Sequence, residues 1–457
     1  MAHSVDMING GLFKKIISFT IPIMLQGLLQ SLYNSADLIV VGQFSGDVAL
    51  AAVGATTSIY NVLIGLFMGI SAGVDVSSSF YYGMRDNKSV KKVIDTSVVL
   101  APILGVFVSL LGFFLAGPVL KVMNTPAGGV LENATLYLQV LMIGVPFSML
   151  NNFCAAIFRT SGETKRPFIY LVIAGLINVL LNILFCAAFD MGVLGVAIAT
   201  VASQIISCIL IFIDLLRNKG LFSFSFKNID FSFHKLGRIV SIGIPAGLQS
   251  AAFSLSNVFL QSGVNSFGDH AIAGSTAVNT IEGLMWVTLS SFQNANTTFI
   301  SQNVAAGKID RARRVLRYTV LMTVVLGLFL GLTFTFGKKW VMAIFIKNNP
   351  VAVEFGYQRL KYTFPLYFLA GIMSILPGAI RGHGQSLPPS LITIIGACGI
   401  RIVWIYTVFQ VHHDLATLYL VHPITWIVTN IALIINYIIA LRMTIKKQKT
   451  QQIALNP

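Results

Sequence analysis

Residues 21–54 read IPIMLQGLLQSLYNSADLIVVGQFSGDVALAAVG, and this pattern indicates the architecture of the whole chain. It predicts an apolar helix long enough to cross a bilayer, then a short Gly-Asp turn and a second apolar run. One carboxylate, Asp37, lies near the middle of the first helix. A second stretch from Ile244, IPAGLQSAAFSLSNVFLQSGVNSFGDHAIAG, repeats the pattern with Leu260 at the position of Asp37. The sequence therefore predicts a duplicated membrane module with an ionisable residue in one copy only.

The repeat keeps a nearly constant spacing along the chain. An offset of 223 residues places Pro22, Gln26 and Asn34 on Pro245, Gln249 and Asn257. After a one-residue deletion near the turn the offset is 222, which places Ile59 on Ile281, Val93 on Val315, Gly162 on Gly384 and Pro167 on Pro389. An even number of helices in each copy gives both copies the same orientation, so we expect an axis along the membrane normal and a substrate site between or within the halves.

The composition indicates an integral membrane protein. Hydrophobic residues make up 55% of the 457 residues, charged residues only 10%, and the mean hydropathy is +0.80; a soluble chain has about 25% charged residues. We predict an all-α fold, because backbone groups in lipid must be paired within the segment. Twelve membrane-length segments are expected at about 16–41, 50–80, 93–117, 134–158, 167–188, 193–216, 240–264, 270–303, 316–337, 357–380, 390–410 and 416–441.

The basic residues predict the orientation and the domain boundaries. Of 31 Lys and Arg, 24 fall in one set of loops, 4 in the other set and 3 in or beside helices. This asymmetry predicts a cell-membrane protein with both termini in the cytoplasm, and it accounts for the net charge of +15 without nucleic acid. We predict an N-terminal six-helix lobe at 1–216, a cytoplasmic linker at 217–238, a C-terminal six-helix lobe at 239–445 and a cytoplasmic tail at 446–457.

Asp37 is the strongest candidate for a functional residue. A charge at the centre of a membrane helix costs about 2.5–3.5 kcal/mol on insertion scales, so such residues face a cavity or partner and mark ion paths. Tyr33 and Asn34 share its helical face. Burial favours the protonated carboxyl, which would let Asp37 bind and release a proton near neutral pH.

Further polar residues could complete this site or serve as interhelical hydrogen-bonding groups, and the sequence favours neither reading. Asn178 and Asn182 occur at i and i+4 in the fifth segment, and Thr200 and Gln204 repeat that spacing in the sixth. Their oxygens can bond Asp37 or coordinate Na⁺.

The second half offers fewer candidates. Glu282, at the repeat position of Tyr60, could be a second cation site or the partner of an intramembrane base such as Arg401. His412 and His413 lack the spacing of helical metal ligands, so we expect a solvated loop and no metal site.

Several motifs together resemble the multidrug and toxic compound extrusion family. They are Ile21-Pro22 with Asn34 and Asp37, LAAVGATTSIYNVL, GVPFSMLNNFCAAIFRTSGETKRP, NVLLNILFCAAFDMGVLGVAIATVASQ, AIAGSTAVNTIEGL and ISQNVAAGKIDRARR. The resemblance covers residues 12–445 and implies two six-helix lobes forming a V, with ion-driven export of organic, often cationic, compounds. Carboxylates that one branch of the family carries are replaced by Phe253 and Ala370. The chain instead resembles the DNA-damage-inducible branch, in which the residue corresponding to Asp37 is the coupling residue; where that branch has Asn and Asp, this chain has Asn178 and Asn182.

We therefore predict a secondary active exporter and not an enzyme. The expected substrates are small organic compounds that are cationic or amphipathic. We expect a monomer in the lipid bilayer, no cofactor, and H⁺ or Na⁺ as the coupling ion. No G-x-x-x-x-G-K-[ST] loop occurs for ATP hydrolysis. Na⁺ coupling on the same scaffold is one alternative. A lipid-linked oligosaccharide flippase is another, although it would favour more cavity cations than Arg401 and Lys361. An intramembrane enzyme would need an H-E-x-x-H, a G-x-S-x-G or paired membrane aspartates, and none of these is convincingly present.

Overall fold

The computed structural model describes residues 4–123, 125–218, 220–346 and 349–455, and within these ranges the regular structure is entirely helical. Most helices exceed the length needed to cross a bilayer. The α-helices are α1 (Leu12–Phe44), α2 (Gly46–Gly83), α3 (Asn87–Val122), α4 (Val130–Thr160), α5 (Lys165–Ile183), α6 (Gly192–Arg217), α7 (Phe233–Asn265), α8 (Asp269–Ala305), α9 (Ile309–Phe336), α10 (Lys338–Phe345), α11 (Pro350–Thr363), α12 (Tyr367–Gly382), α13 (Leu387–Thr393), α14 (Ile400–Tyr406), α15 (Val408–Val411) and α16 (Leu415–Leu455).

Two π-helical turns, Leu184–Ala188 and Ile394–Gly399, interrupt matching segments of the two halves. Such turns occur often at functional sites. The first follows α5 directly and the second directly precedes α14.

Eleven helical segments in the described part of the chain are long and apolar enough to cross a membrane. The predicted eighth segment is also one continuous helix, α8, but its Asn, Gln, Ser and Thr content lowers its hydropathy and it is not among the eleven. The chain is a multi-pass membrane protein, and the prediction of an all-α membrane fold is confirmed.

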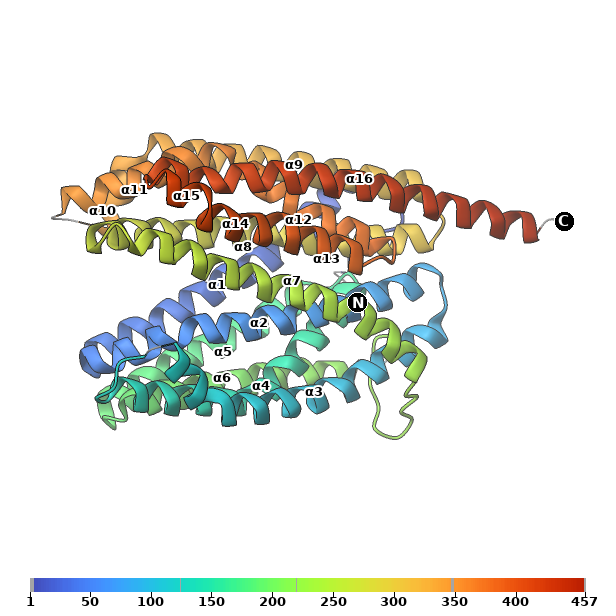
Figure 1. Cartoon of the computed structure of the whole chain (residues 1–457). Helices are drawn as coiled ribbons and strands as arrows, with labels where there is room; N and C mark the ends of the chain where they lie inside the picture. Colours follow the sequence, from blue (N-terminus) through green and yellow to red (C-terminus); the bar gives the residue numbers. More distant parts are fainter. Residues whose placement is uncertain (1–3, 124, 219, 347–348, 456–457) are drawn as a thin grey trace. The chain divides into compact units, whose positions relative to one another are not determined.

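The helices group into two compact units. Unit 1 comprises residues 1–5 and 21–243, and unit 2 comprises residues 6–20 and 244–457. Within unit 1, α4 packs against α2, α3 and α6 (Figure 1). Gly105 of α3 lies against the backbone of Pro146 of α4, where a Cβ atom would collide, so a small residue permits the close approach of these two helices.

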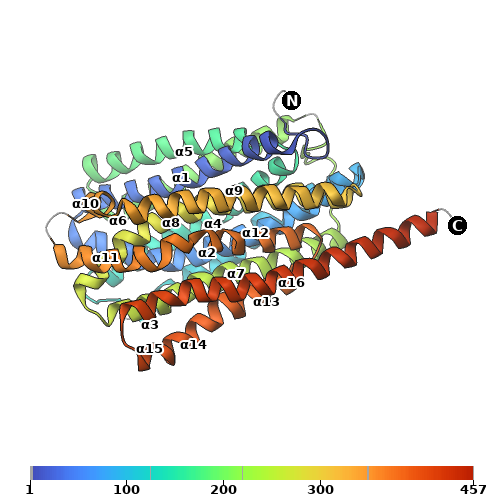
Figure 2. The same ribbon diagram turned by 90° about the horizontal axis from the view of Figure 1, so that it is seen from above.

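Within unit 2, α12 lies between α9 and α16 and also packs against α8 (Figure 2). The C-terminal part of α16 extends past its neighbours in this unit. The residues predicted as a cytoplasmic tail continue this helix as far as Leu455.

Both compact units differ at their edges from the predicted lobes. Residues 217–238, predicted as a linker, pack on unit 1: Phe222 and Phe224 are buried, the Lys91 ammonium donates to the Ser223 carbonyl oxygen at 2.7 Å, and the Asp230 backbone N–H donates to the Asp95 carboxylate at 3.1 Å. These contacts explain why the segment belongs to unit 1.

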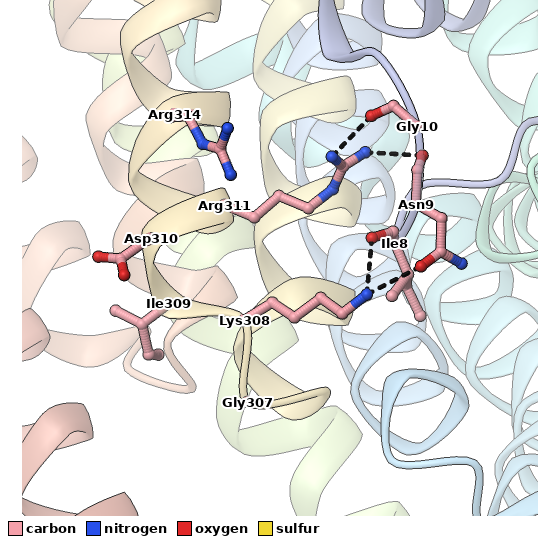
Figure 3. Close-up of a pocket in the computed structure, with 9 residues that line it drawn as sticks. All are labelled: Ile8, Asn9, Gly10, Gly307, Lys308, Ile309, Asp310, Arg311 and Arg314. Carbon is pink, nitrogen blue, oxygen red and sulfur yellow. Dashed lines mark hydrogen bonds between the residues drawn. The ribbon is translucent and has the colours of Figure 1, made fainter.

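The N-terminal residues 6–20 belong to unit 2 because their backbone is bonded to α8 and α9. Met7 is buried, and its carbonyl oxygen accepts from Asn303 at 3.0 Å. Arg311 donates to the carbonyl oxygens of Asn9 and Gly10 at 2.9 and 2.7 Å (Figure 3). Lys308 donates to the Ile8 carbonyl oxygen at 3.2 Å and to the Asn9 side chain at 2.8 Å. Lys308 and Arg311 therefore hold the N-terminal backbone in place by hydrogen bonds to its carbonyl oxygens.

Candidate functional site

Asp37 of α1 is the centre of a polar cluster inside unit 1. Its side chain is only 7% exposed. One carboxylate oxygen accepts from the Asn182 amide of α5 at 2.5 Å, and the other accepts from the Thr200 hydroxyl of α6 at 3.3 Å. Among the described residues, no Lys, Arg or His lies within 4.0 Å of this carboxylate. The cluster therefore holds a buried carboxylate with neutral partners from two other helices.

The spacing of the α5 amides produces this arrangement. Asn178 and Asn182 lie one helical turn apart and are both buried. The Asn182 amide group donates to the Asn178 side-chain oxygen at 3.3 Å as well as to Asp37. The Asn182 oxygen, Oδ1, is buried without a hydrogen-bond donor. A free acceptor therefore exists on a residue that already contacts Asp37.

Gln204, one turn after Thr200 on α6, has a different partner. Its amide donates to the Tyr60 hydroxyl of α2 at 2.7 Å, and its side-chain oxygen is buried without a donor. Gln204 thus links α6 to α2, and no sequence pattern predicts its pairing with Tyr60.

The side chains of Tyr33 and Asn34 form hydrogen bonds with residues other than Asp37. The Tyr33 hydroxyl donates to the Val172 carbonyl oxygen of α5 at 3.4 Å, and the Asn34 side-chain oxygen accepts from Gln30 at 3.4 Å. The Tyr33 ring packs on Gly175, where a Cβ atom would collide with it. Of the residues predicted around Asp37, the structure brings together Asn178, Asn182 and Thr200, whereas Tyr33 and Asn34 point to other partners.

Unit 2 has an ion pair at the repeat position of Tyr60. Glu282 of α8 accepts from Arg359 of α11 at 2.6 Å. Arg359 is buried and also donates to the Ser275 hydroxyl at 2.5 Å. The prediction that Glu282 could pair with an intramembrane base is confirmed, but the base is Arg359 and not Arg401. Arg359 lies one turn before the C-terminal end of α11. It contacts Glu282 because α11 packs directly on α8.

Arg401 of α14 is buried and donates instead to two neutral residues of α7, Ser256 at 3.0 Å and Asn257 at 2.7 Å. His413, in the predicted solvated loop, contacts the Ser266 hydroxyl at 2.9 Å and stacks on Phe267. No group of three or more His, Cys, Asp or Glu suited to a metal ion occurs in the part of the chain that the structure describes.

Comparison with known proteins identifies the family. The family model described as MatE matches two segments, residues 22–184 and 245–407. The chain belongs to the MatE family. The two matched segments coincide with the two copies of the repeat, so the predicted duplication and the predicted family are both confirmed.

Two curated relatives and one solved structure illustrate the likeness. This MatE chain is 28% identical over 390 residues to the probable multidrug resistance protein YpnP of Bacillus subtilis (strain 168), covering 85% of this chain and 87% of that protein. It is 25% identical over 395 residues to the probable multidrug resistance protein NorM of Thermotoga maritima, covering 84% and 82%. A crystal structure of a MATE protein in a bent conformation shares the fold with a TM-score of 0.87 at 22% identity, covering 98% of both chains.

Proposed function

We propose that this MatE chain is a secondary active exporter of organic compounds in which Asp37 binds the coupling proton. The observation that carries the proposal is the environment of Asp37: a buried carboxylate within a membrane-length helix, bonded to Asn182 and Thr200 and to no cationic side chain in the described chain. A buried charge without a counter-ion is costly, so this carboxyl should take up a positive charge from solution. A proton can neutralise the Asp37 carboxylate by binding to one of its oxygens, without further ligands.

Protonation would change the hydrogen bonds between three helices. The ionised carboxylate only accepts hydrogen bonds, whereas the protonated carboxyl also donates one. The unpartnered Oδ1 of Asn182 is a ready acceptor for that new donor, provided that the amide turns. Because Asp37, Asn182 and Thr200 lie on α1, α5 and α6, each proton would alter how these helices are bonded. We infer that this change biases the equilibrium between the inward-binding and outward-releasing states.

Na⁺ coupling is the second candidate, and a specific observation favours it. Na⁺ prefers hard oxygen ligands, and the cluster offers the Asp37 carboxylate, the Thr200 hydroxyl and the Asn178 and Asn182 side-chain oxygens. The Asn182 oxygen has no donor to compete with a cation. Proton binding needs only the carboxyl, which is why we place it first.

The substrate class is inferred from the relatives and from charge. The curated relatives are named as multidrug resistance proteins, and an anionic site in unit 1 would attract organic cations. We propose export across the cell membrane with both termini in the cytoplasm, as the distribution of basic residues indicates. If the protein moves no organic cation under either gradient, flipping of lipid-linked oligosaccharide is the alternative function.

The test is efflux of a fluorescent organic cation from proteoliposomes under H⁺ and Na⁺ gradients imposed separately. We compare wild type with Asp37→Asn and with Asp47→Asn, which makes the same chemical change at an exposed position of α2. Proton-driven efflux that Asp37→Asn abolishes and Asp47→Asn retains is the expected result. Robust efflux by Asp37→Asn would reject the mechanism. Efflux driven by Na⁺ alone would favour the sodium-coupled form.

A further inference from the structure

Arg401 is a buried cation without an ionic partner. It lies in a membrane-length segment and is fully buried. Its guanidinium donates to Ser256 and Asn257, which are neutral, and its Nε atom has no acceptor. No carboxylate of the described chain lies within 4.0 Å of this guanidinium; Glu282 lies within electrostatic range but is bonded to Arg359. Ser256 and Asn257 therefore hold the guanidinium in place without neutralising it.

Another buried polar side chain without partners lies within electrostatic range of Arg401. His422 of α16 is 3% exposed and neither ring nitrogen has a partner. It lies within electrostatic range of both Arg401 and Arg359. Buried polar groups are normally paired, and the Nε atom of Arg401 lacks an acceptor. A negatively charged acceptor would also offset the charge of Arg401.

Aromatic rings adjoin the arginine. The Arg401 guanidinium carbon lies 5.4 Å from the centre of the Phe253 ring, and Phe253 stacks on Trp286 with ring centres 5.1 Å apart and 12° between the planes. Both aromatic side chains are half-buried, and Asn257 is exposed. Two half-buried aromatic rings and one exposed amide therefore lie in sequence and contact next to the buried charge.

We propose that Arg401 anchors a binding site for organic anions in unit 2. A carboxylate, phosphate or sulfonate group would bond to the guanidinium, whose planar donors suit such groups, and an aromatic body would stack on Trp286. The π-helical turn that ends at Gly399 positions the arginine at the start of α14. This site has the opposite charge preference to the Asp37 cluster and goes beyond the proposed cation export, since it can be tested by binding alone.

The experiment is equilibrium dialysis of the full chain in phosphatidylcholine nanodiscs against 4-nitrobenzenesulfonate, read by the absorbance of the nitro ring. Empty nanodiscs provide the blank, and 4-nitrophenyltrimethylammonium is a cation with the same ring. Variants are Arg401→Gln, Arg401→Lys and, as a matched loss of charge at an exposed residue, Lys447→Gln. Trp286→Ala tests the aromatic contact without touching the arginine.

We expect saturable sulfonate binding that Arg401→Gln weakens about tenfold to a hundredfold, the range for losing a hydrogen bond to a charged group. Arg401→Lys should weaken it less, and Lys447→Gln should leave it unchanged. The cation should bind wild type and Arg401→Gln equally, which shows that the variant is folded. If Arg401→Gln does not fold, a weaker affinity of Trp286→Ala for the sulfonate, with unchanged cation binding, supports the site.

Equal sulfonate binding by wild type and a folded Arg401→Gln would overturn the proposal. Sodium sulfate and sodium methanesulfonate are added as competitors to separate the charge from the ring. If either competes as strongly as the aromatic sulfonate, the site takes small anions and the aromatic part of the assignment is wrong.

Discussion

Removing Arg359 should destabilise the protein far more than removing Arg359 and Glu282 together. Their side chains are 4% and 16% exposed and lie 2.6 Å apart. Arg359→Met leaves the Glu282 carboxylate without its partner, and breaking a buried pair from one side costs about 3–5 kcal/mol. In the double variant Arg359→Met/Glu282→Gln both charges are gone, so most of that cost should be recovered.

The expected size of the effect follows from the size of unit 2. For a domain of about 150–250 residues, 1 kcal/mol shifts Tm by about 2–4 °C, so Arg359→Met should lower Tm by about 6–20 °C. Near-UV circular dichroism of the purified protein in detergent measures this shift, and the double variant should lie within a few degrees of wild type. Proton-driven efflux by Glu282→Gln should keep the wild-type number of protons per substrate, because we propose Asp37 as the coupling residue and assign the pair a structural role.

Two results would refute this reasoning. Equal Tm values for Arg359→Met and the double variant would mean that the 2.6 Å contact does not govern stability. A Glu282→Gln protein with unchanged Tm but fewer protons moved per substrate would instead make Glu282 a second coupling site.

Three smaller changes test other parts of the structure. Asp86 caps α3 by accepting from the Ser89 backbone N–H at 3.0 Å, so Asp86→Ala should lower the free energy of unfolding by about 1 kcal/mol and Asp86→Asn by much less, measured as a shift in Tm. Hydrogen bonds from Ser89 lower the pKa of the Asp86 carboxyl. The stability that its ionised form contributes is therefore present above about pH 4 and is lost as the pH falls through the lowered pKa. Gly175→Ala should displace the Tyr33 ring and lower Tm by several degrees, whereas Gly54→Ala, with open space around it, should have little effect. Arg311 donates to the carbonyl oxygens of Met7, Asn9 and Gly10, so Arg311→Ala should speed amide hydrogen exchange in residues 7–11. Unchanged exchange would show that the other contacts suffice.

Much of the fold could be predicted because bilayer physics restricts it. Long apolar segments must be helical, and the constant offset of the repeat divides them into two sets. The least apolar segment, α8, shows the limit of hydropathy: it is a helix of 37 residues, yet its amides and hydroxyls keep it outside the range of a typical spanning segment. The edges of the units could not be predicted either, since Met7 is bonded by Asn303 and Arg311, which lie 296 and 304 residues away in the sequence.

The candidate site was predictable where local periodicity determines it. Asn178 and Asn182 share a helical face by their spacing, and both belong to the Asp37 cluster. Tyr33 lies one turn from Asp37 by the same argument, but its hydroxyl bonds Val172. Helical spacing says which residues share a face, and only the packing of neighbouring helices decides which partner a long side chain reaches. For the same reason the sequence could not choose between Arg359 and Arg401 as the partner of Glu282.

The two copies of the repeat differ in their buried charge, and this difference unites the proposals. Asp37 has Leu260 as its counterpart, so the acidic site exists in unit 1 alone. Tyr60 corresponds to Glu282, whose charge Arg359 offsets within unit 2. That pairing leaves Arg401 as a buried cation without a carboxylate in the described chain. A duplicated scaffold that only had to be stable would gain nothing from the buried charges of Asp37 and Arg401, because each charge costs free energy in the membrane. We therefore propose that Asp37 and Arg401 mark two separate sites of opposite charge preference, one for cations in unit 1 and one for anions in unit 2.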